Sequence, residues 1–307
     1  MVTKQGVVTR STGSWYTVLT GDGEKVDCKI KGRFRIEGIR TTNPVAVGDM
    51  VDFQMSDAGY AVITKIHERK NYIIRKATKL SKATHIIASN IDQAIVIVSL
   101  VKPRTSTGFI DRFLVTAEAY HIPVSIIFNK FDLYDEEVKQ QLEYYVAVYS
   151  EIGYNCLVTS VPDSLHLDEF RALLRDKMNL LAGHSGVGKS ALINAIDPKL
   201  NLKEGQISKI HEKGRHTTTF AEMFPLDFGG AIIDTPGIKE FGLVGFDKAE
   251  LGQRFPEMRQ RMHECRFNNC LHVDEPGCAV VKALEEGEIA EFRYMNYLNM
   301  LETLDTA

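Results

Sequence analysis

Long apolar stretches are missing from this sequence. No run of about 18 apolar residues occurs, which excludes a membrane-spanning helix of ordinary length. The opening residues, MVTKQGVVTRSTG, lack the apolar segment of a signal peptide, and no lipidation motif is evident. Low-complexity segments are also missing, and the 44% hydrophobic and 25% charged content is typical of globular proteins. We therefore expect a cytoplasmic protein that makes no membrane contact.

Cysteine is scarce, and its placement argues against disulfides. Two of the five cysteines stand alone, and the others form the pattern Cys265-x4-Cys270-x-His272-x5-Cys278. In a reducing compartment such a cluster is more typical of a metal site. Three thiolates and one imidazole can hold Zn²⁺ in a closed tetrahedral site, which is structural rather than catalytic. Reduced cysteines without a metal are the alternative interpretation.

Charge is distributed unevenly along the chain. Residues 1–82 contain 15 Lys and Arg against 8 Asp and Glu, whereas the whole chain contains 37 against 40. A basic segment on an otherwise acidic protein favours a surface that faces a polyanion. A solvated domain that happens to be basic explains the same numbers.

Residues 1–70 contain short apolar strands separated by turn residues. The candidate strands are GVVTR, WYTVLT, KVDCKIKG, DMVDFQM and YAVITKIHE. Many short strands without helical periodicity predict a small closed barrel. An OB-fold fits this length best, and an SH3-like barrel is the alternative.

The pattern changes after residue 70. Residues 71–92 are basic and rich in turn residues, as in a linker. Short apolar runs then alternate with helical stretches, which predicts a mainly parallel, doubly wound α/β sheet. Residues 246–307 indicate helices broken by the Cys/His cluster. We therefore predict an all-β barrel over 1–70, an α/β domain over 71–245 and a mostly helical zinc-binding domain over 246–307.

A phosphate-binding loop lies between an apolar run and a helical segment. Residues 183–190 match G-x-x-x-x-G-K-S without a mismatch. Its glycines let backbone N–H groups close around phosphates, Lys189 reaches the β and γ phosphates, and the Ser190 hydroxyl ligates Mg²⁺. A glycine-rich turn with an incidental Lys-Ser pair is the alternative.

A guanine-recognition motif precedes the phosphate loop. Asn129-Lys130-Phe131-Asp132 follows the apolar run IPVSIIF and resembles N-K-x-D of GTPases. The Asp132 carboxylate can accept hydrogen bonds from N1–H and the 2-amino group of guanine, which adenine does not offer. Ser160, after the next apolar run, resembles part of the loop that completes the base pocket. An ordinary exit from a strand is the alternative there.

Two further segments resemble GTPase switches. Asp234-Thr235-Pro236-Gly237 matches D-x-x-G, in which Asp234 holds Mg²⁺ through water and the Gly237 N–H bonds the γ-phosphate. Upstream, Thr217 and Thr218 lie where a switch threonine senses Mg²⁺. An aliphatic residue, Ile238, stands where Ras-like enzymes carry a water-positioning Gln, so intrinsic hydrolysis should be slow. His216 is a candidate for positioning that water, and an exposed histidine without a catalytic part is the alternative.

These motifs occur in permuted order, since the guanine motif precedes the phosphate loop and the switches follow it. The order, the barrel, GHSGVGKS, GRHTTT and the cysteine cluster together resemble the RsgA (YjeQ) family of circularly permuted GTPases. The resemblance covers nearly the whole chain. It implies an OB-fold, a P-loop GTPase domain and a zinc domain that act in late maturation of the small ribosomal subunit. It also implies GTP hydrolysis stimulated by that subunit.

The resemblance implies a GTP/GDP site with Mg²⁺ and one structural Zn²⁺. The residues expected at the nucleotide are Asn129, Lys130, Asp132, Ser160, Gly183, His184, Ser185, Gly186, Val187, Gly188, Lys189, Ser190, Ala191, Thr217, Thr218, Asp234 and Gly237. The expected partners are the small ribosomal subunit, its rRNA and assembly factors, and the expected oligomeric state is a monomer.

Basic residues near the barrel are candidates for rRNA contact, with a solvated face as the alternative for each. They are Lys29, Lys31, Arg33, Arg35, Arg40, Arg69, Lys70, Arg75, Lys76, Lys79 and Lys82. Trp15 can stack on a base, as OB-fold aromatic residues do. Burial in the barrel core is the interpretation we favour for Trp15.

Two other functions fit parts of the sequence. A nucleotide-gated RNA-binding module would use the same motifs with incidental hydrolysis. A metabolic P-loop kinase is disfavoured, because the guanine motif is present and no acceptor-substrate motif is evident.

Overall fold

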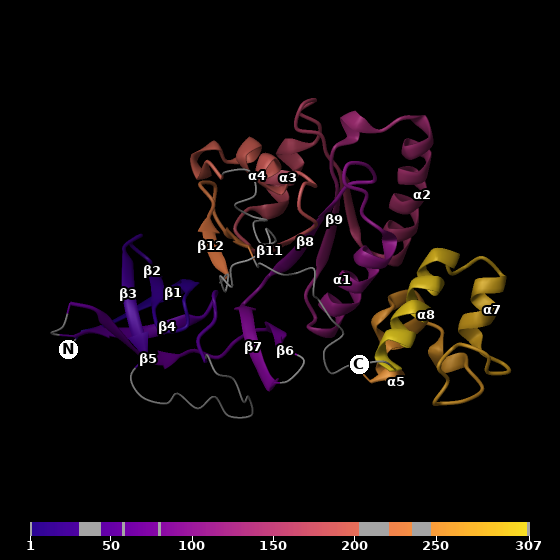
Figure 1. Cartoon of the computed structure of the whole chain (residues 1–307), viewed down its shortest axis with the longest axis horizontal. Coiled ribbons are helices and arrows are strands. Elements are labelled where there is room, and N and C mark those ends of the chain that lie inside the picture. The colour runs from indigo at the N-terminus through magenta and orange to yellow at the C-terminus, as the bar shows by residue number, and fades with distance from the viewer. Residues whose placement is uncertain are drawn as a thin grey trace.

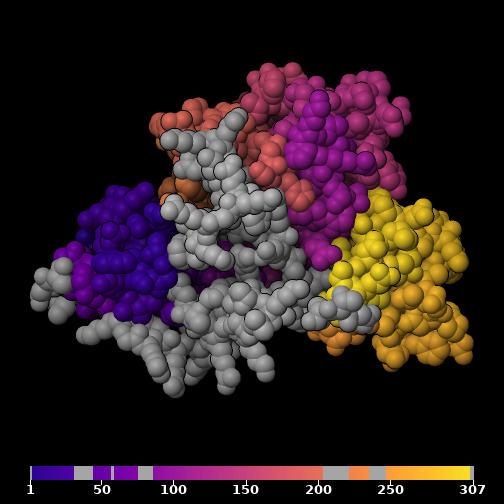
Figure 2. All heavy atoms as spheres, in the orientation of Figure 1, coloured from indigo at the N-terminus to yellow at the C-terminus, as the bar shows by residue number. Residues whose placement is uncertain are grey.

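The structure is a computed structural model that describes residues 2–30, 44–56, 59–78, 81–202, 221–234 and 247–305. Three parts follow one another along the chain (Figure 1): a barrel, a central α/β domain and a C-terminal helical part. The barrel and the helical part lie on opposite sides of the molecule in the space-filling view (Figure 2).

Five strands form the N-terminal barrel. They are β1 (Thr3–Ser11), β2 (Tyr16–Thr20), β3 (Lys25–Ile30), β4 (Met50–Met55) and β5 (Ala61–Ile66). Their order is β1-β2-β3-β5-β4, and β4 pairs with β1 to close the barrel. Alternate side chains point inward, so Tyr16, Val18 and Phe53 are buried in its core. The predicted barrel is confirmed, and its topology is that of an OB-fold.

The segment predicted to be a linker contains a hairpin. Strands β6 (Tyr72–Thr78) and β7 (Ser81–Ser89) pair with each other in a separate two-stranded sheet. Ile73 and Ala88 are buried, and Ala88 forms a bridge with Val47, next to the barrel. The prediction of a linker over 71–92 therefore missed two strands, because the basic residues and turn formers there hid a short apolar alternation.

The central domain is the expected doubly wound sheet. Its strands are β8 (Gln93–Val98), β9 (Val124–Phe128), β10 (Asn155–Val158), β11 (Met178–Ala182), β12 (Glu222–Pro225) and β13 (Ala231–Asp234). Its helices are α1 (Thr107–Ala119), α2 (Glu136–Ile152), α3 (Leu167–Leu174) and α4 (Lys189–Ile196). The order is β10-β9-β8-β11-β13-β12, and all neighbours are parallel except β12 and β13. Alternate β8 residues pack into the two cores on either face of the sheet.

The barrel and the central domain share one sheet. Strand β1 pairs with β12 where Arg10 faces Glu222, so eleven strands are joined continuously. The sequence analysis did not predict β12, which is only four residues long. A buried cluster strengthens the same junction: Asp49 accepts hydrogen bonds from Arg69 and from the Ser89 hydroxyl. Arg69 therefore forms an ion pair with Asp49, and only 8% of its side chain is exposed, which disfavours the expected contact with rRNA.

The C-terminal part is mostly helical, as predicted. It contains α5 (Lys248–Leu251), α6 (Pro256–Arg259), α7 (Ala279–Glu285) and α8 (Glu291–Asp305). Phe255, Tyr297 and Met300 lie in its core, and Val115 of α1 packs into the same core. Helix α8 therefore lies against the central domain (Figure 1).

Charged side chains are buried at this second junction. Arg293 of α8 donates to Asp111 of α1 and to Glu257 of α6. Tyr149 and Asn296 also donate to Asp111. Each polar group of this cluster thus finds partners from another element, which the sequence analysis did not foresee.

Helices in the described part of the chain fall short of the length or hydrophobicity that crossing a membrane requires.

Candidate nucleotide and metal sites

Four predicted nucleotide-binding segments meet at one edge of the sheet. The phosphate loop follows β11, the guanine motif follows β9, Ser160 follows β10 and Asp234 ends β13. These strands are parallel, so their carboxyl ends lie at the same edge, where doubly wound folds bind ligands.

Close packing fixes the path of the phosphate loop. Gly183 has φ +138°, and a Cβ there would lie 2.2 Å from the Ile97 carbonyl oxygen. Gly188 has φ +96°, and its Cβ would lie 2.5 Å from Nδ2 of Asn129. Only glycine fits such positions. The two glycines therefore let the loop lie directly against β8 and the guanine motif.

Some residues of the loop are buried and others are exposed to solvent. Lys189 and Ser190 are buried at the start of α4, whereas Ser185, Gly186 and Ala191 are exposed. Lys189 donates from Nζ to the carbonyl oxygens of residues 183 and 184, at 2.7 and 2.8 Å. The ammonium group thus lies inside the curve of the loop, where a phosphate oxygen can replace a carbonyl partner.

The guanine motif is tied directly to the phosphate loop. Asn129 donates from Nδ2 to the Val187 carbonyl oxygen at 2.9 Å and accepts from the Thr159 hydroxyl at 3.0 Å. Tyr134 donates to the Asn129 carbonyl oxygen and accepts from the Leu100 N–H. The sequence analysis recognised Asn129 but missed Tyr134, which no local motif distinguishes.

Asp132 is exposed, and its carboxylate has a hydrogen-bond partner in Ser160 on one side. The Ser160 hydroxyl lies 2.9 Å from Asp132 and 3.0 Å from Asp163, so it can donate to either carboxylate. Lys130 adopts φ +68° and donates from Nζ to the Lys102 carbonyl oxygen. This geometry leaves Asp132 open to a base while fixing its direction.

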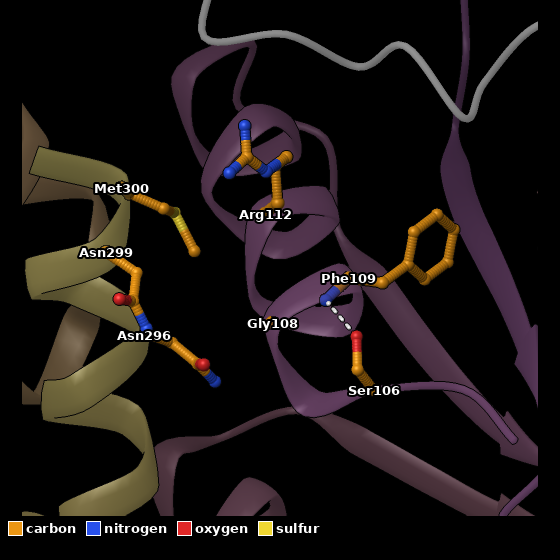
Figure 3. Close-up of a pocket in the computed structure, with 7 residues that line it drawn as sticks. All are labelled: Ser106, Gly108, Phe109, Arg112, Asn296, Asn299 and Met300. Atoms are coloured by element: carbon orange, nitrogen blue, oxygen red, sulfur yellow. Dashed lines mark hydrogen bonds between the residues drawn. The ribbon is translucent and has the colours of Figure 1, made fainter. Parts of the chain in front are cut away.

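His184 does not stand free in the phosphate loop. Its ring packs on Phe109 of α1, with centroids 4.0 Å apart and planes inclined by 35°. A small cavity begins beside Phe109, between the first turns of α1 and one side of α8 (Figure 3). It is lined by Ser106, Gly108, Phe109, Arg112, Asn296, Asn299 and Met300. The phosphate loop and the C-terminal helix therefore contact the same end of α1.

Asp234 lies at the end of β13, half-buried near Lys189. Burial raises the pKa of Asp234 to about 7, the Lys189 charge opposes the rise, and Glu222 adds to it. A bound cation at this carboxylate would favour its charged form. The remaining predicted switch residues, His216, Thr217, Thr218, Gly237 and Ile238, lie outside the described residues.

The Cys/His cluster has the dimensions of a zinc site. The ligand atoms of Cys265, Cys270, His272 and Cys278 all lie within 4.8 Å of one another. Nδ1 of His272 lies 3.4 Å from Sγ of Cys278 and 3.7 Å from Sγ of Cys265. A tetrahedron with ordinary Zn–S and Zn–N bonds requires about 3.5 Å between these atoms. The donor types and these two distances therefore fit a Zn²⁺ site.

Neighbouring groups fix the loops of this cluster. Tyr294 of α8 donates to the His272 carbonyl oxygen at 2.7 Å. Glu275 accepts from the backbone N–H groups of Leu271 and Val273. Burial raises the pKa of the Cys270 thiol to about 12. Zn²⁺ would displace that proton, since it binds the thiolate.

Trp15 is not a core residue, contrary to expectation. It is 41% exposed in the loop between β1 and β2, and its neighbour Tyr16 fills the barrel instead. Trp15 precedes β2, whose inward-facing positions begin with Tyr16.

Comparisons with known proteins agree with the site geometry. Residues 66–244 match the model of the RsgA GTPase family, and residues 5–63 match that of the RsgA N-terminal domain. A small ribosomal subunit biogenesis GTPase RsgA from Phocaeicola vulgatus is 53% identical over 298 residues, covering 97% of this chain and 96% of the relative. One from Christiangramia forsetii is 52% identical over 301 residues, with the same coverage.

Solved structures extend the likeness to the whole fold. The crystal structure of YjeQ from Thermotoga maritima has a TM-score of 0.79 at 36% identity and covers 99% of both chains. YloQ, described as a circularly permuted GTPase, has a TM-score of 0.75 at 31% identity, covering 99% of this chain and 96% of its own. The chain therefore belongs to the RsgA family of circularly permuted GTPases and is a GTP-hydrolysing enzyme.

Proposed function

We propose that this enzyme hydrolyses GTP to GDP and phosphate on the small ribosomal subunit, late in the maturation of that subunit. The observation that carries the GTP-dependent part is the hydrogen bond from Asn129 to Val187, which joins the guanine motif to the phosphate loop. The ribosomal part rests on the names of relatives that match 97% of this chain.

The nucleotide would lie along the carboxyl edge of the sheet. Asp132 recognises guanine, with Ser160 orienting its carboxylate, and the N–H groups of residues 183–191 receive the phosphates. Lys189 moves its hydrogen bonds from carbonyl oxygens to the β and γ phosphates. Ser190 and Asp234 would hold Mg²⁺, which neutralises charge on the phosphates during in-line attack by water.

The switch segment supplies the remaining functional groups in this proposal. Thr217 and Thr218 sense Mg²⁺, the Gly237 N–H bonds the γ-phosphate, and His216 positions the water. Ile238 cannot orient water, which explains why hydrolysis should depend on the bound subunit. We expect this chain alone to hydrolyse GTP slowly and the bound subunit to complete the catalytic site.

The zinc cluster has a structural part in this proposal. Cys265, Cys270, His272 and Cys278 would hold one Zn²⁺ and stabilise the helical domain, assigned to residues 246–307. The barrel (1–70) and the helical domain flank the GTPase domain (71–245) (Figure 2). In this proposal both of them contact rRNA. We expect a cytoplasmic monomer that also meets assembly factors on the subunit.

The decisive experiment measures phosphate release from GTP and from ATP, with and without purified small or large subunits. We expect strong stimulation with GTP and small subunits only. Turnover of GTP that ignores ribosomes would contradict the ribosomal assignment, and equal turnover of ATP would contradict the role of Asp132.

A nucleotide-gated RNA-binding module is the second candidate. The basic composition of residues 1–82 favours it. The variant Lys189→Ala separates the two functions. If stimulated turnover disappears while subunit binding persists, hydrolysis is the step that follows binding. If small subunits do not stimulate the native protein, and Lys189→Ala loses only slow basal turnover, the RNA-binding module is the better description.

A further inference from the structure

Strands β8 and β9 stop pairing directly at the edge of the sheet that carries the nucleotide motifs. The last direct bond runs from the Asn129 N–H to the Val98 carbonyl oxygen, at 2.8 Å. In a continued parallel ladder the Leu100 N–H would next donate to the Asn129 carbonyl oxygen. It donates instead to the Tyr134 hydroxyl at 2.8 Å, and that hydroxyl donates to the Asn129 carbonyl oxygen at 2.9 Å. The hydroxyl therefore replaces one bond of the ladder and separates the two strands there.

Tyr134 is fixed in this place by packing. It is 5% exposed and belongs to the core on one face of the sheet, where its ring centroid lies 5.9 Å from that of Phe131. Burial raises the pKa of the Tyr134 hydroxyl, so the group stays protonated at neutral pH and remains a donor. The ring thus serves the core, while the hydroxyl connects the two strand ends.

The residue that receives this hydrogen bond also positions the phosphate loop. The Asn129 side chain donates to the Val187 carbonyl oxygen of that loop and accepts from the Thr159 hydroxyl. Gly188 lies so close that a Cβ on it would be 2.5 Å from Nδ2 of Asn129. A shift of the Asn129 backbone toward β8 therefore changes the spacing between the guanine motif and the phosphate loop.

The strand end on the other side of the hydroxyl leads into the loop between β8 and α1, which touches both segments. Lys130 of the guanine motif donates from Nζ to the Lys102 carbonyl oxygen, at 2.7 Å. Pro103 faces the phosphate loop, since a Cβ on Gly186 would lie 3.4 Å from its Cδ. The hydroxyl consequently fixes the end of β9 that carries the guanine motif and, through Leu100, the start of the loop beside it.

We propose that the Tyr134 hydroxyl is a positioning group for the nucleotide. It sets the spacing between the guanine motif and the phosphate loop, so that one nucleotide binds through its base and its phosphates at the same time. This inference deepens the proposed function and rests on it, because that function assigns both segments to a single guanine nucleotide.

The variant Tyr134→Phe keeps the ring in the core and removes the hydroxyl alone. The Leu100 N–H and the Asn129 carbonyl oxygen are then left without this partner, or they move together into a direct bond. The first result loosens the guanine motif, and the second draws it toward β8. Both impair the binding of a ligand that must reach the two segments together.

Fragments of the nucleotide test the spacing separately from each half of the site. Calorimetric titration of the full-length protein measures the dissociation constants of GDP, guanosine and pyrophosphate, for the native chain and for Tyr134→Phe. GDP binding should weaken by roughly 3- to 30-fold, as expected when about one or two hydrogen bonds are misplaced. Guanosine and pyrophosphate should lose much less affinity, because each occupies one half of the site and does not depend on the spacing.

Turnover gives a second readout. In Tyr134→Phe the KM for GTP should rise by the same factor as the dissociation constant of GDP, while kcat stays unchanged, because the hydroxyl touches no reacting atom. Tyr297→Phe is the matched control. This buried tyrosine donates to the Leu271 carbonyl oxygen at 2.6 Å in the C-terminal part, so the variant loses a similar hydrogen bond but should keep the native KM.

A conservative replacement separates the hydroxyl's donor function from general damage to the fold. Incorporating para-aminophenylalanine in place of Tyr134 restores a donor at the same position and should recover most of the GDP affinity. If Tyr134→Phe does not fold, this second variant decides the question, since it should bind GDP nearly as well as the native protein.

Four outcomes overturn the proposal: native GDP affinity in Tyr134→Phe, equal losses for GDP and pyrophosphate, a fall in kcat at unchanged KM, or no recovery with para-aminophenylalanine. Failure of the proposed function is distinct from all four. A native protein that binds GDP poorly, or that turns over ATP as well as GTP, contradicts that function before any variant is compared.

Discussion

Replacing Arg293 by methionine removes the cation from a buried cluster between the GTPase domain and the C-terminal helices. Arg293 and Asp111 are fully buried, and 8% of the Glu257 side chain is exposed. The guanidinium lies 2.6 Å from the Asp111 carboxylate and 2.7 Å from that of Glu257. Without it, two carboxylates remain buried beside each other with no opposite charge.

The loss of folding stability depends on which charges each variant leaves buried without a partner. Removing one partner of a buried ion pair costs about 3–5 kcal/mol, because the other charge is left uncompensated. Arg293→Met should lower the free energy of unfolding by at least that amount. Asp111→Asn should cost less, about 1–3 kcal/mol, because Arg293 keeps Glu257 and the amide oxygen still accepts hydrogen bonds. Burial already raises the pKa of Asp111, and the Arg293 charge opposes that rise.

Native-state hydrogen exchange is the suitable assay, since it reports the free energy of opening for each helix separately. Protection of α1 and α8 should fall in Arg293→Met, while β1–β5 serve as the internal reference. Lys282→Met is the matched control, because it breaks an exposed pair with Glu286 worth about 0–1 kcal/mol. Unchanged protection of α8 in Arg293→Met, or an equal loss in Asp111→Asn, would refute the reasoning.

Three further predictions concern the nucleotide and metal sites. Gly188→Ala should abolish tight binding of a fluorescent GDP analogue, because its Cβ would lie 2.5 Å from an amide nitrogen of the guanine motif; Gly153→Ala, also at positive φ but in open space, should bind normally. The Mg²⁺ dependence of GTP-analogue binding should shift to higher Mg²⁺ below pH 7, because Asp234, whose pKa is raised to about 7, must lose its proton; Asp234→Asn should remove the shift. Cys278→Ala should release zinc, measured by a chelating dye, and loosen α7, since Sγ also caps that helix, whereas Cys156→Ala should retain the metal.

Much of the site could be predicted because its motifs are local. The phosphate loop needs glycines, a lysine and a serine at fixed spacing between a strand and a helix, and the structure has β11 and α4 on either side of it. The four residues of the Cys/His cluster also lie close in sequence. Their ligand atoms come together within 4.8 Å, as the spacing indicated.

Other features were not predicted because they depend on which residues meet in the folded chain. Arg69 resembles any basic surface residue until Asp49 is placed against it. Trp15 is apolar enough for a core, and only the strand register assigns the inward position to Tyr16. Strand β12 is short and becomes recognisable through its pairing with β1 and β13.

The sequence by itself therefore determined the class of fold, the GTPase motifs, their permuted order and the Cys/His cluster, since the motifs and the cluster each depend on a few neighbouring backbone positions. Tertiary structure alone decided how the domains are joined. Arg293 and Asp111 are 182 residues apart, and they become a buried ion pair only when α8 packs on α1. Burial and charge pairing depend on segments that are distant in sequence and meet only in the folded protein. Residue patterns along the chain therefore do not predict them.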